Sequence, residues 1–196
     1  MRLLVYDRTC VRTGGRLSPV WASGATLYRA LGRIDAAYGA DSWAGALAWI
    51  AAQPAPITEL QYWGHGKWGC AFIDRDVLDA GRLPELAVLR ERLAPDALVW
   101  FRTCETFGAR RGQDFAARLA DFLGARVAGH THVIGFHQSG LHGLVPGARP
   151  HWSAAEGVAE GTPEAPVSAR SSRPWAPHTI TALRGAVPAD WFTSRS

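Results

Sequence analysis

Two short apolar runs constrain the fold of this chain more than any other feature. One is Leu60-Gln61-Tyr62-Trp63 and the other Ala97-Leu98-Val99-Trp100-Phe101, and each is typical of a buried strand. Apolar residues recur at helical spacing in the segments 27–34, 43–50, 86–93 and 115–123. Strands that alternate with helices predict an α/β fold, here a three-layer α/β/α sandwich with a mostly parallel central sheet.

The same reading divides the chain into a regular body and an irregular end. We expect further strands at 3–6, 70–73, 126–128 and 133–136, a loop at 7–24, and a helix N-cap at Ser42. After about residue 140 the periodic pattern fails, and six of the twelve prolines fall between Pro146 and Pro177. The prediction is therefore one α/β domain over residues 1–155, with an extension over 156–196 that packs on it or is partly mobile.

Composition narrows the classes of partner. The net charge is +4 and the pI about 9.3, but the basic residues are scattered, so nucleic acid is not the expected partner. No apolar stretch approaches the roughly 20 residues that span a bilayer, and we expect no membrane partner. We expect most of the nine tryptophans to fill the core and some to line a groove.

The cysteine count bears on the compartment. The chain has three cysteines, Cys10, Cys70 and Cys104. This low and odd number argues against a disulfide framework and fits a reducing environment. The first residues reach the charge of Asp7 too soon for a signal peptide, so we expect a cytoplasmic protein. Cys10 and Cys70 are expected to be structural.

His65 and Cys104 carry the strongest chemical signal. Each follows one of the two apolar runs, and residues just beyond the carboxyl ends of neighbouring parallel strands share one crevice. An imidazole beside a thiol forms a base and a nucleophile. The backbone N–H groups of Gly66 and Cys104 are candidates to hold an oxyanion. The alternatives are a small buried Cys104 and a His65 that merely completes a turn.

These residues resemble a known family. The segments Ile57–Gly66 and Ala97–Cys104 are similar to the caspase-like (clan CD) cysteine peptidases, in which one strand ends in His-Gly and the next core strand in the nucleophilic Cys. The segments 112–120 and 124–129 and the tripeptide His151-Trp152-Ser153 resemble bacterial caspase-like domains in particular. The likeness covers residues 58–155. It implies a peptidase that cleaves a protein or peptide substrate through a thioester acyl-enzyme, with no cofactor and no metal.

The chain also departs from the caspase pattern. The His-to-Cys gap is 104 − 65 = 39 residues, against roughly 50 in caspases. Glu105-Thr106 follows the cysteine where caspases have Arg-Gly. No strand is predicted between Tyr6 and the His65 strand, where caspases have one. A catalytically inactive caspase-like module that binds or regulates a partner is therefore the alternative function.

Arg102 is the candidate specificity residue. It takes the place of the Gln in the caspase Gln-Ala-Cys motif, so the resemblance implies that it binds an acidic side chain just before the scissile bond (P1). Arg8 and Arg12 are candidates to join it. The alternative is an ion pair between Arg102 and Asp7 or Glu105. If Asp7 faces the pocket instead, a basic P1 residue is favoured.

Two other motifs have competing interpretations. The segment Gly64–Gly69 matches G-x-G-x-x-G, but a strand is expected to follow it, whereas a dinucleotide site needs a helix there. The second motif is a histidine cluster: His130, His132, His137, His142 and His151. A His-x-His pair suits a metal, which would make a metal-dependent hydrolase the third candidate. The window 127–151 contains no Asp or Glu, so we expect a polar rim and no metal.

Overall fold

A mixed, mostly parallel sheet of seven strands forms the centre of the molecule. The computed structural model describes residues 1–11 and 17–193. The sheet order is β14-β10-β8-β7-β3-β1-β2. Its strands are β1 (Arg2–Asp7), β2 (Ala36–Ala40), β3 (Ile57–Trp63), β7 (Leu93–Arg102), β8 (Arg126–His130), β10 (Leu141–Leu144) and β14 (Phe192–Thr193). The strands β2, β1, β3, β7 and β8 are parallel, and β10 runs antiparallel to β8.

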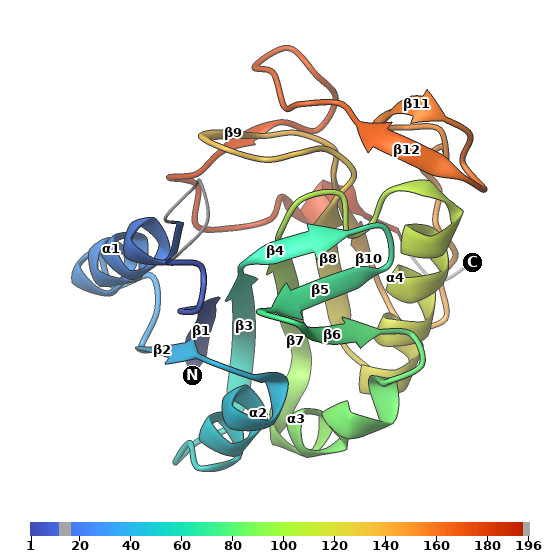
Figure 1. Cartoon of the computed structure of the whole chain (residues 1–196). Helices are drawn as coiled ribbons and strands as arrows, with labels where there is room; N and C mark the ends of the chain where they lie inside the picture. Colours follow the sequence, from blue (N-terminus) through green and yellow to red (C-terminus); the bar gives the residue numbers. More distant parts are fainter. Residues whose placement is uncertain (12–16, 194–196) are drawn as a thin grey trace.

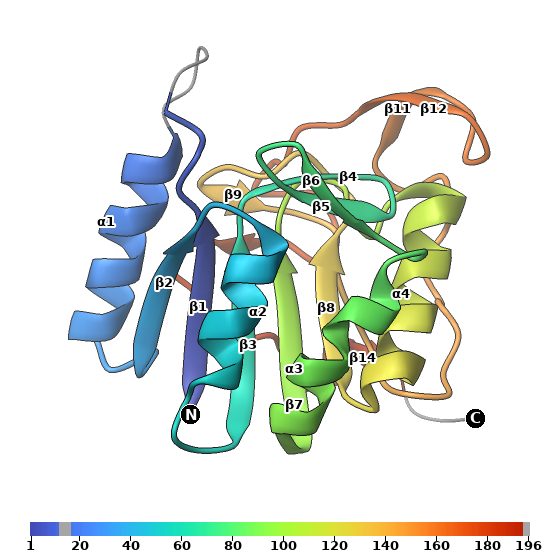
Figure 2. The same ribbon diagram turned by 60° about the horizontal axis from the view of Figure 1, so that its bottom comes forward.

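Both faces of the sheet are covered, which confirms the three-layer α/β prediction. The main core packs α2 (Trp43–Ala51), α3 (Ala87–Arg92) and α4 (Ala109–Leu123) on one face. On the other face α1 (Leu17–Ala30) covers β1 and β3, and the C-terminal segment covers β7 and β8. Figures 1 and 2 show α1 apart from the other three helices. Side chains alternate along a strand, so Val99 and Phe101 face the helices while Trp100 faces the C-terminal segment.

Local sequence signals account for two helix boundaries. The Ser42 side chain accepts a hydrogen bond from the Gly45 N–H at 3.1 Å, as the predicted N-cap of α2 requires. Helix α4 ends at Gly124, whose φ of 62° is the left-handed conformation that glycine adopts without strain.

Smaller elements lie above the carboxyl ends of the parallel strands. The predicted strand at 70–73 is confirmed as β5 (Cys70–Ile73), which forms an antiparallel sheet with β4 (His65–Lys67) and β6 (Asp76–Asp79). Figure 2 shows this sheet lying across the ends of β3 and β7. The other small elements are η1 (Leu83–Leu86), β9 (His137–Gln138), β11 (Val158–Gly161), β12 (Pro166–Ala169), β13 (Ile180–Thr181) and η2 (Ala189–Trp191).

The N-terminal third differs from the sequence prediction. Segment 36–40 forms the edge strand β2, although its small residues carry little strand signal. Helix α1 begins at Leu17, so the predicted loop over 7–24 is wrong. The helix buries Ala25 and Tyr28, whereas Leu27, which belongs to the apolar pattern of the sequence, is 43% exposed.

The second half contains two more differences. Residues 133–136 form no strand, and Val133 makes only an isolated bridge to Ser171. Beyond residue 140 the chain returns to the sheet as β10, and β14 at its end pairs with β10. Within the described residues, no helix combines the length and the apolar character needed to cross a bilayer.

Candidate functional site

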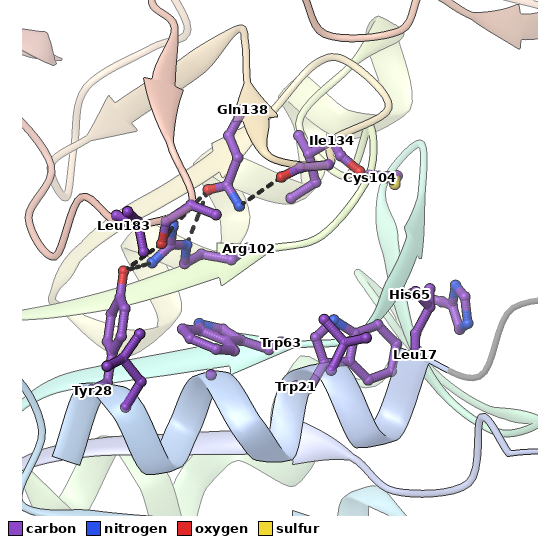
Figure 3. Close-up of a pocket in the computed structure, with 16 residues that line it drawn as sticks. Leu17, Trp21, Tyr28, Trp63, His65, Arg102, Cys104, Ile134, Gln138 and Leu183 are labelled. Carbon is purple, nitrogen blue, oxygen red and sulfur yellow. Dashed lines mark hydrogen bonds between the residues drawn. The ribbon is translucent and has the colours of Figure 1, made fainter. Parts of the chain in front are cut away.

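A pocket of about 260 Å³ opens at the carboxyl ends of β3 and β7. Its other walls come from α1, from Ile134 and Gly135, from Gln138 of β9 and from residues 182–183. His65 and Cys104 both line it, so the structure brings the two candidate catalytic side chains to one cavity. In Figure 3 they lie at one end of the pocket, and Tyr28 and Leu183 lie at the other.

His65 is exposed and takes a partner that sequence analysis missed. It opens β4, two residues after the last residue of β3. Its Nε2 atom lies 3.2 Å from the Sγ atom of Cys10, and its ring packs edge-on against Trp21 at 5.4 Å. Cys10 follows β1, whose carboxyl end lies at the same edge of the sheet as that of β3. This position, three residues past a central strand, was the signal that could have identified Cys10.

Cys104 has a different environment. Its thiol lies 4.0 Å from the carbonyl oxygen of Ile134, at the margin of a hydrogen bond to sulfur. Burial raises the pKa of this thiol, and the neighbouring Glu105 carboxylate raises it further. The thiol is therefore protonated at neutral pH, and a nucleophilic role requires a base to remove the proton.

The lack of a side chain at Gly66 lets strand β4, which carries His65, lie close to the turn that carries Cys104. A Cβ atom at this position would lie 2.2 Å from Thr106 Oγ1 and 2.7 Å from the carbonyl oxygen of Cys104. A larger residue would push the His65 loop away from the Cys104 loop. On the Cys104 side, the hydroxyls of Thr103 and Thr106 are 2.5 Å apart and brace the turn. Stabilisation of an oxyanion by the Gly66 and Cys104 N–H groups stays a prediction.

Arg102 lines the pocket but is almost fully buried. Its guanidinium donates to Gln138, Tyr28 and Gln61 and to the carbonyl oxygens of two C-terminal residues, Ala182 and Arg184. It also lies over the rings of Trp100, Trp63 and Tyr28. Desolvation lowers the pKa of Arg102, although the group stays charged.

The predicted ion pair between Arg102 and Asp7 or Glu105 is wrong, because every acceptor around the guanidinium is a neutral group. Asp7 is buried and accepts hydrogen bonds from the backbone and hydroxyl of Thr9. Arg8 pairs with Asp41 at the surface. Neither Asp7 nor Arg8 lines the pocket, and Arg12 lies outside the described residues.

Only part of the histidine cluster forms the expected polar rim, because His151 is exposed and His137 is half-buried, whereas the other three histidines are buried. His130, His132 and His142 are all at most 5% exposed. The His142 Nε2 atom lies 2.7 Å from a Glu156 carboxylate oxygen, which also accepts from Thr131 at 2.8 Å. In the described part of the chain, no three His, Cys, Asp or Glu side chains lie in an arrangement that would hold a metal ion.

The remaining motif has the local structure expected for it. The segment Gly64–Gly69 leads into β5 and not into a helix, so it lacks the helix N-terminus of a dinucleotide site.

Comparison of the chain with models of protein families, with curated proteins and with solved structures gave no match in any of the three.

Proposed function

We propose that this chain is a caspase-like cysteine endopeptidase with Cys104 as nucleophile and His65 as general base and acid. The observation that carries the proposal is that both side chains line one pocket at the ends of adjacent parallel strands. The close approach of Gly66 to the Cys104 loop supports it, because His and Cys sit on backbones in contact. The proposed location is the cytoplasm, where a reducing environment preserves thiols.

The proposed reaction proceeds in two halves. His65 takes the proton of the Cys104 thiol, and the thiolate attacks the carbonyl carbon of the scissile peptide bond. The resulting oxyanion is held by the Gly66 and Cys104 N–H groups. His65 then gives its proton to the leaving amine as the C–N bond breaks, which leaves a thioester. A water molecule, deprotonated by His65, hydrolyses the thioester to a carboxylic acid and restores the thiol.

This mechanism requires His65 to exchange partners. Its ring bonds Cys10 in the resting structure. The mechanism needs rotation about the side-chain torsions of His65 to bring the imidazole to Cys104. Sterically, the exposure of His65 leaves its ring room to turn.

The first test is the pH dependence of alkylation by iodoacetamide, mapped to each of the three cysteines by mass spectrometry. In the wild type, we expect Cys104 to be labelled at pH 6–7 faster than Cys70. In His65→Ala, labelling of Cys104 should require a pH above the usual thiol range of about 8.5, because burial raises its pKa.

Other outcomes of this test discriminate between hypotheses. Labelling that selects Cys10 and depends on His65 would identify Cys10 as the activated thiol in place of Cys104. Slow labelling of all three cysteines, with no effect of His65→Ala, would favour the inactive binding or regulatory module. Two observations favour the inactive module: the pKa of the Cys104 thiol is raised, and His65 contacts Cys10.

A further inference from the structure

We propose that the pocket beside Cys104 accepts a large apolar side chain, preferably aromatic, from the P1 residue of a peptide substrate. This inference rests on the proposed peptidase function. It replaces the acidic P1 residue that the family resemblance implies for Arg102.

The walls of the pocket are apolar side chains left open to solvent. Leu17, Val20 and Leu27 on α1 are 37%, 62% and 43% exposed, and Leu183 on the facing segment is 50% exposed. Large apolar side chains gathered around one cavity indicate a site that a ligand covers. The aromatic rings of Trp21, Trp63 and Tyr28 line the same space, where Figure 3 shows them in a row along α1.

The polar groups of the pocket offer little to a charged side chain. Each nitrogen of Arg102 already donates to an acceptor inside the protein, and Gln138 Oε1 is one of those acceptors. A substrate carboxylate would have to displace these bonds or stay unpaired in an apolar site, which is costly. A basic side chain would meet the positive charge of Arg102, and no Asp or Glu is among the described residues that line the pocket.

The size of the cavity favours one side chain over a whole ligand. Its volume of about 260 Å³ lies below the roughly 300–1,000 Å³ of small-molecule sites. Cys104 and His65 lie at one end, so a side chain inserted toward Tyr28 would leave its own carbonyl carbon beside the thiol. This geometry assigns the pocket to the residue that is attacked.

The test uses four chloromethyl ketones, benzyloxycarbonyl-Ala-Ala-Xaa with Xaa as Phe, Leu, Asp or Lys, and measures the rate of Cys104 alkylation. Iodoacetamide, which has no side chain, reports thiol reactivity alone. Each rate is divided by the rate of iodoacetamide labelling. After this normalisation, the Phe and Leu reagents should react at least about tenfold faster than the Asp and Lys reagents. An Asp reagent that reacts as fast as the Phe reagent would overturn the inference and restore Arg102 as a carboxylate site.

Two leucines four residues apart provide matched variants. Leu27 lines the pocket, whereas Leu31 is 54% exposed and does not line it. Leu27→Gln should slow the Phe reagent roughly three- to tenfold with no change in iodoacetamide labelling, and Leu31→Gln should change neither. Equal behaviour of the two variants would count against the pocket assignment.

Failure of catalysis can be separated from failure of this inference. If no reagent labels Cys104, the peptidase proposal fails, and the pocket is then judged by saturation-transfer NMR on Cys104→Ala. With acetyl-Ala-Ala-Phe-amide as probe, transfer to the phenyl protons that Leu27→Gln weakens would retain the apolar site. Absence of transfer, or equal transfer to acetyl-Ala-Ala-Asp-amide, would overturn it.

Discussion

At the scale of single residues, the state of His65 decides what the site can do. Its ring contacts the thiol of Cys10, and the same side chain lines the pocket together with Cys104. A hydrogen bond of this kind contributes about 0.5–1.5 kcal/mol, so the His65 ring favours this position but can leave it at a small cost in free energy. In the proposed mechanism, the bond between His65 and Cys10 would therefore compete with formation of the dyad.

Replacement of Cys10 tests this. Cys10→Ala removes the sulfur that bonds His65, so His65 should reach Cys104 more often, and Cys104 alkylation at pH 7 should rise roughly two- to tenfold. Cys10→Ser retains a hydrogen-bonding group and is the matched control, expected to stay close to wild type. A slower rate in Cys10→Ala would show that Cys10 assists the reaction.

At the scale of elements, the packing of α1 against β3 sets the shape of the pocket. Gly24 faces Trp63 so closely that a Cβ atom would lie 2.6 Å from the Cζ3 atom of the indole. Real atoms do not approach so closely, so any side chain at residue 24 must move the helix or the ring. The glycine lets α1 lie close to the sheet although it weakens the helix by about 1 kcal/mol relative to alanine.

Gly24→Ala should consequently destabilise the protein despite the better helix propensity of alanine. Overpacking of this kind costs roughly 1–3 kcal/mol, which exceeds the gain in propensity. Chemical denaturation should show a lower free energy of unfolding, and the Phe reagent should react more slowly as Trp63 shifts. Ser23→Ala, at the exposed neighbouring position, is the control, and an equal or higher stability of Gly24→Ala would contradict the packing argument.

At the scale of the whole molecule, the C-terminal segment completes the second face of the sheet. Tyr28 and Arg102 both bond the carbonyl oxygens of Ala182 and Arg184, which lie 80 and 82 residues from Arg102 and 154 and 156 residues from Tyr28 in the sequence. Behind them, His130 is buried in β8, where its Nδ1 atom lies 3.1 Å from the carbonyl oxygen of Ser139. Burial lowers the pKa of His130 to about 3.

This pKa predicts an acid-sensitive fold. In the unfolded chain, a histidine binds a proton below about pH 6.5, whereas folded His130 stays neutral down to about pH 3. Stability contributed by His130 is present above pH 6.5 and is lost as the pH falls, by about 2 kcal/mol between pH 7 and pH 5. His130→Asn retains a hydrogen-bond donor for the carbonyl oxygen of Ser139. In this variant, the free energy of unfolding should fall less between pH 7 and pH 5, because the contribution of His130 is absent. Equal pH dependence of the two proteins in denaturant titrations would contradict the prediction.

Many of the strands and helix ends could be predicted from the local sequence, because buried strands and helix caps have characteristic short-range patterns of residues. The apolar runs before His65 and Cys104 and the Ser42 cap have the structures predicted for them. Strand β2 and the start of α1 were missed, since an edge strand of small residues and a half-exposed helix lack a strong period.

The sequence by itself determined the layered α/β fold and the placement of His65 and Cys104 at one edge of the sheet. Periodicity reports which face of an element is buried, and parallel strands bring their carboxyl ends together. Only the tertiary structure decided the partners: Cys10 beside His65, and the carbonyl oxygens that enclose Arg102. Such partners are distant in the chain, and no local period records which distant atom a side chain will meet.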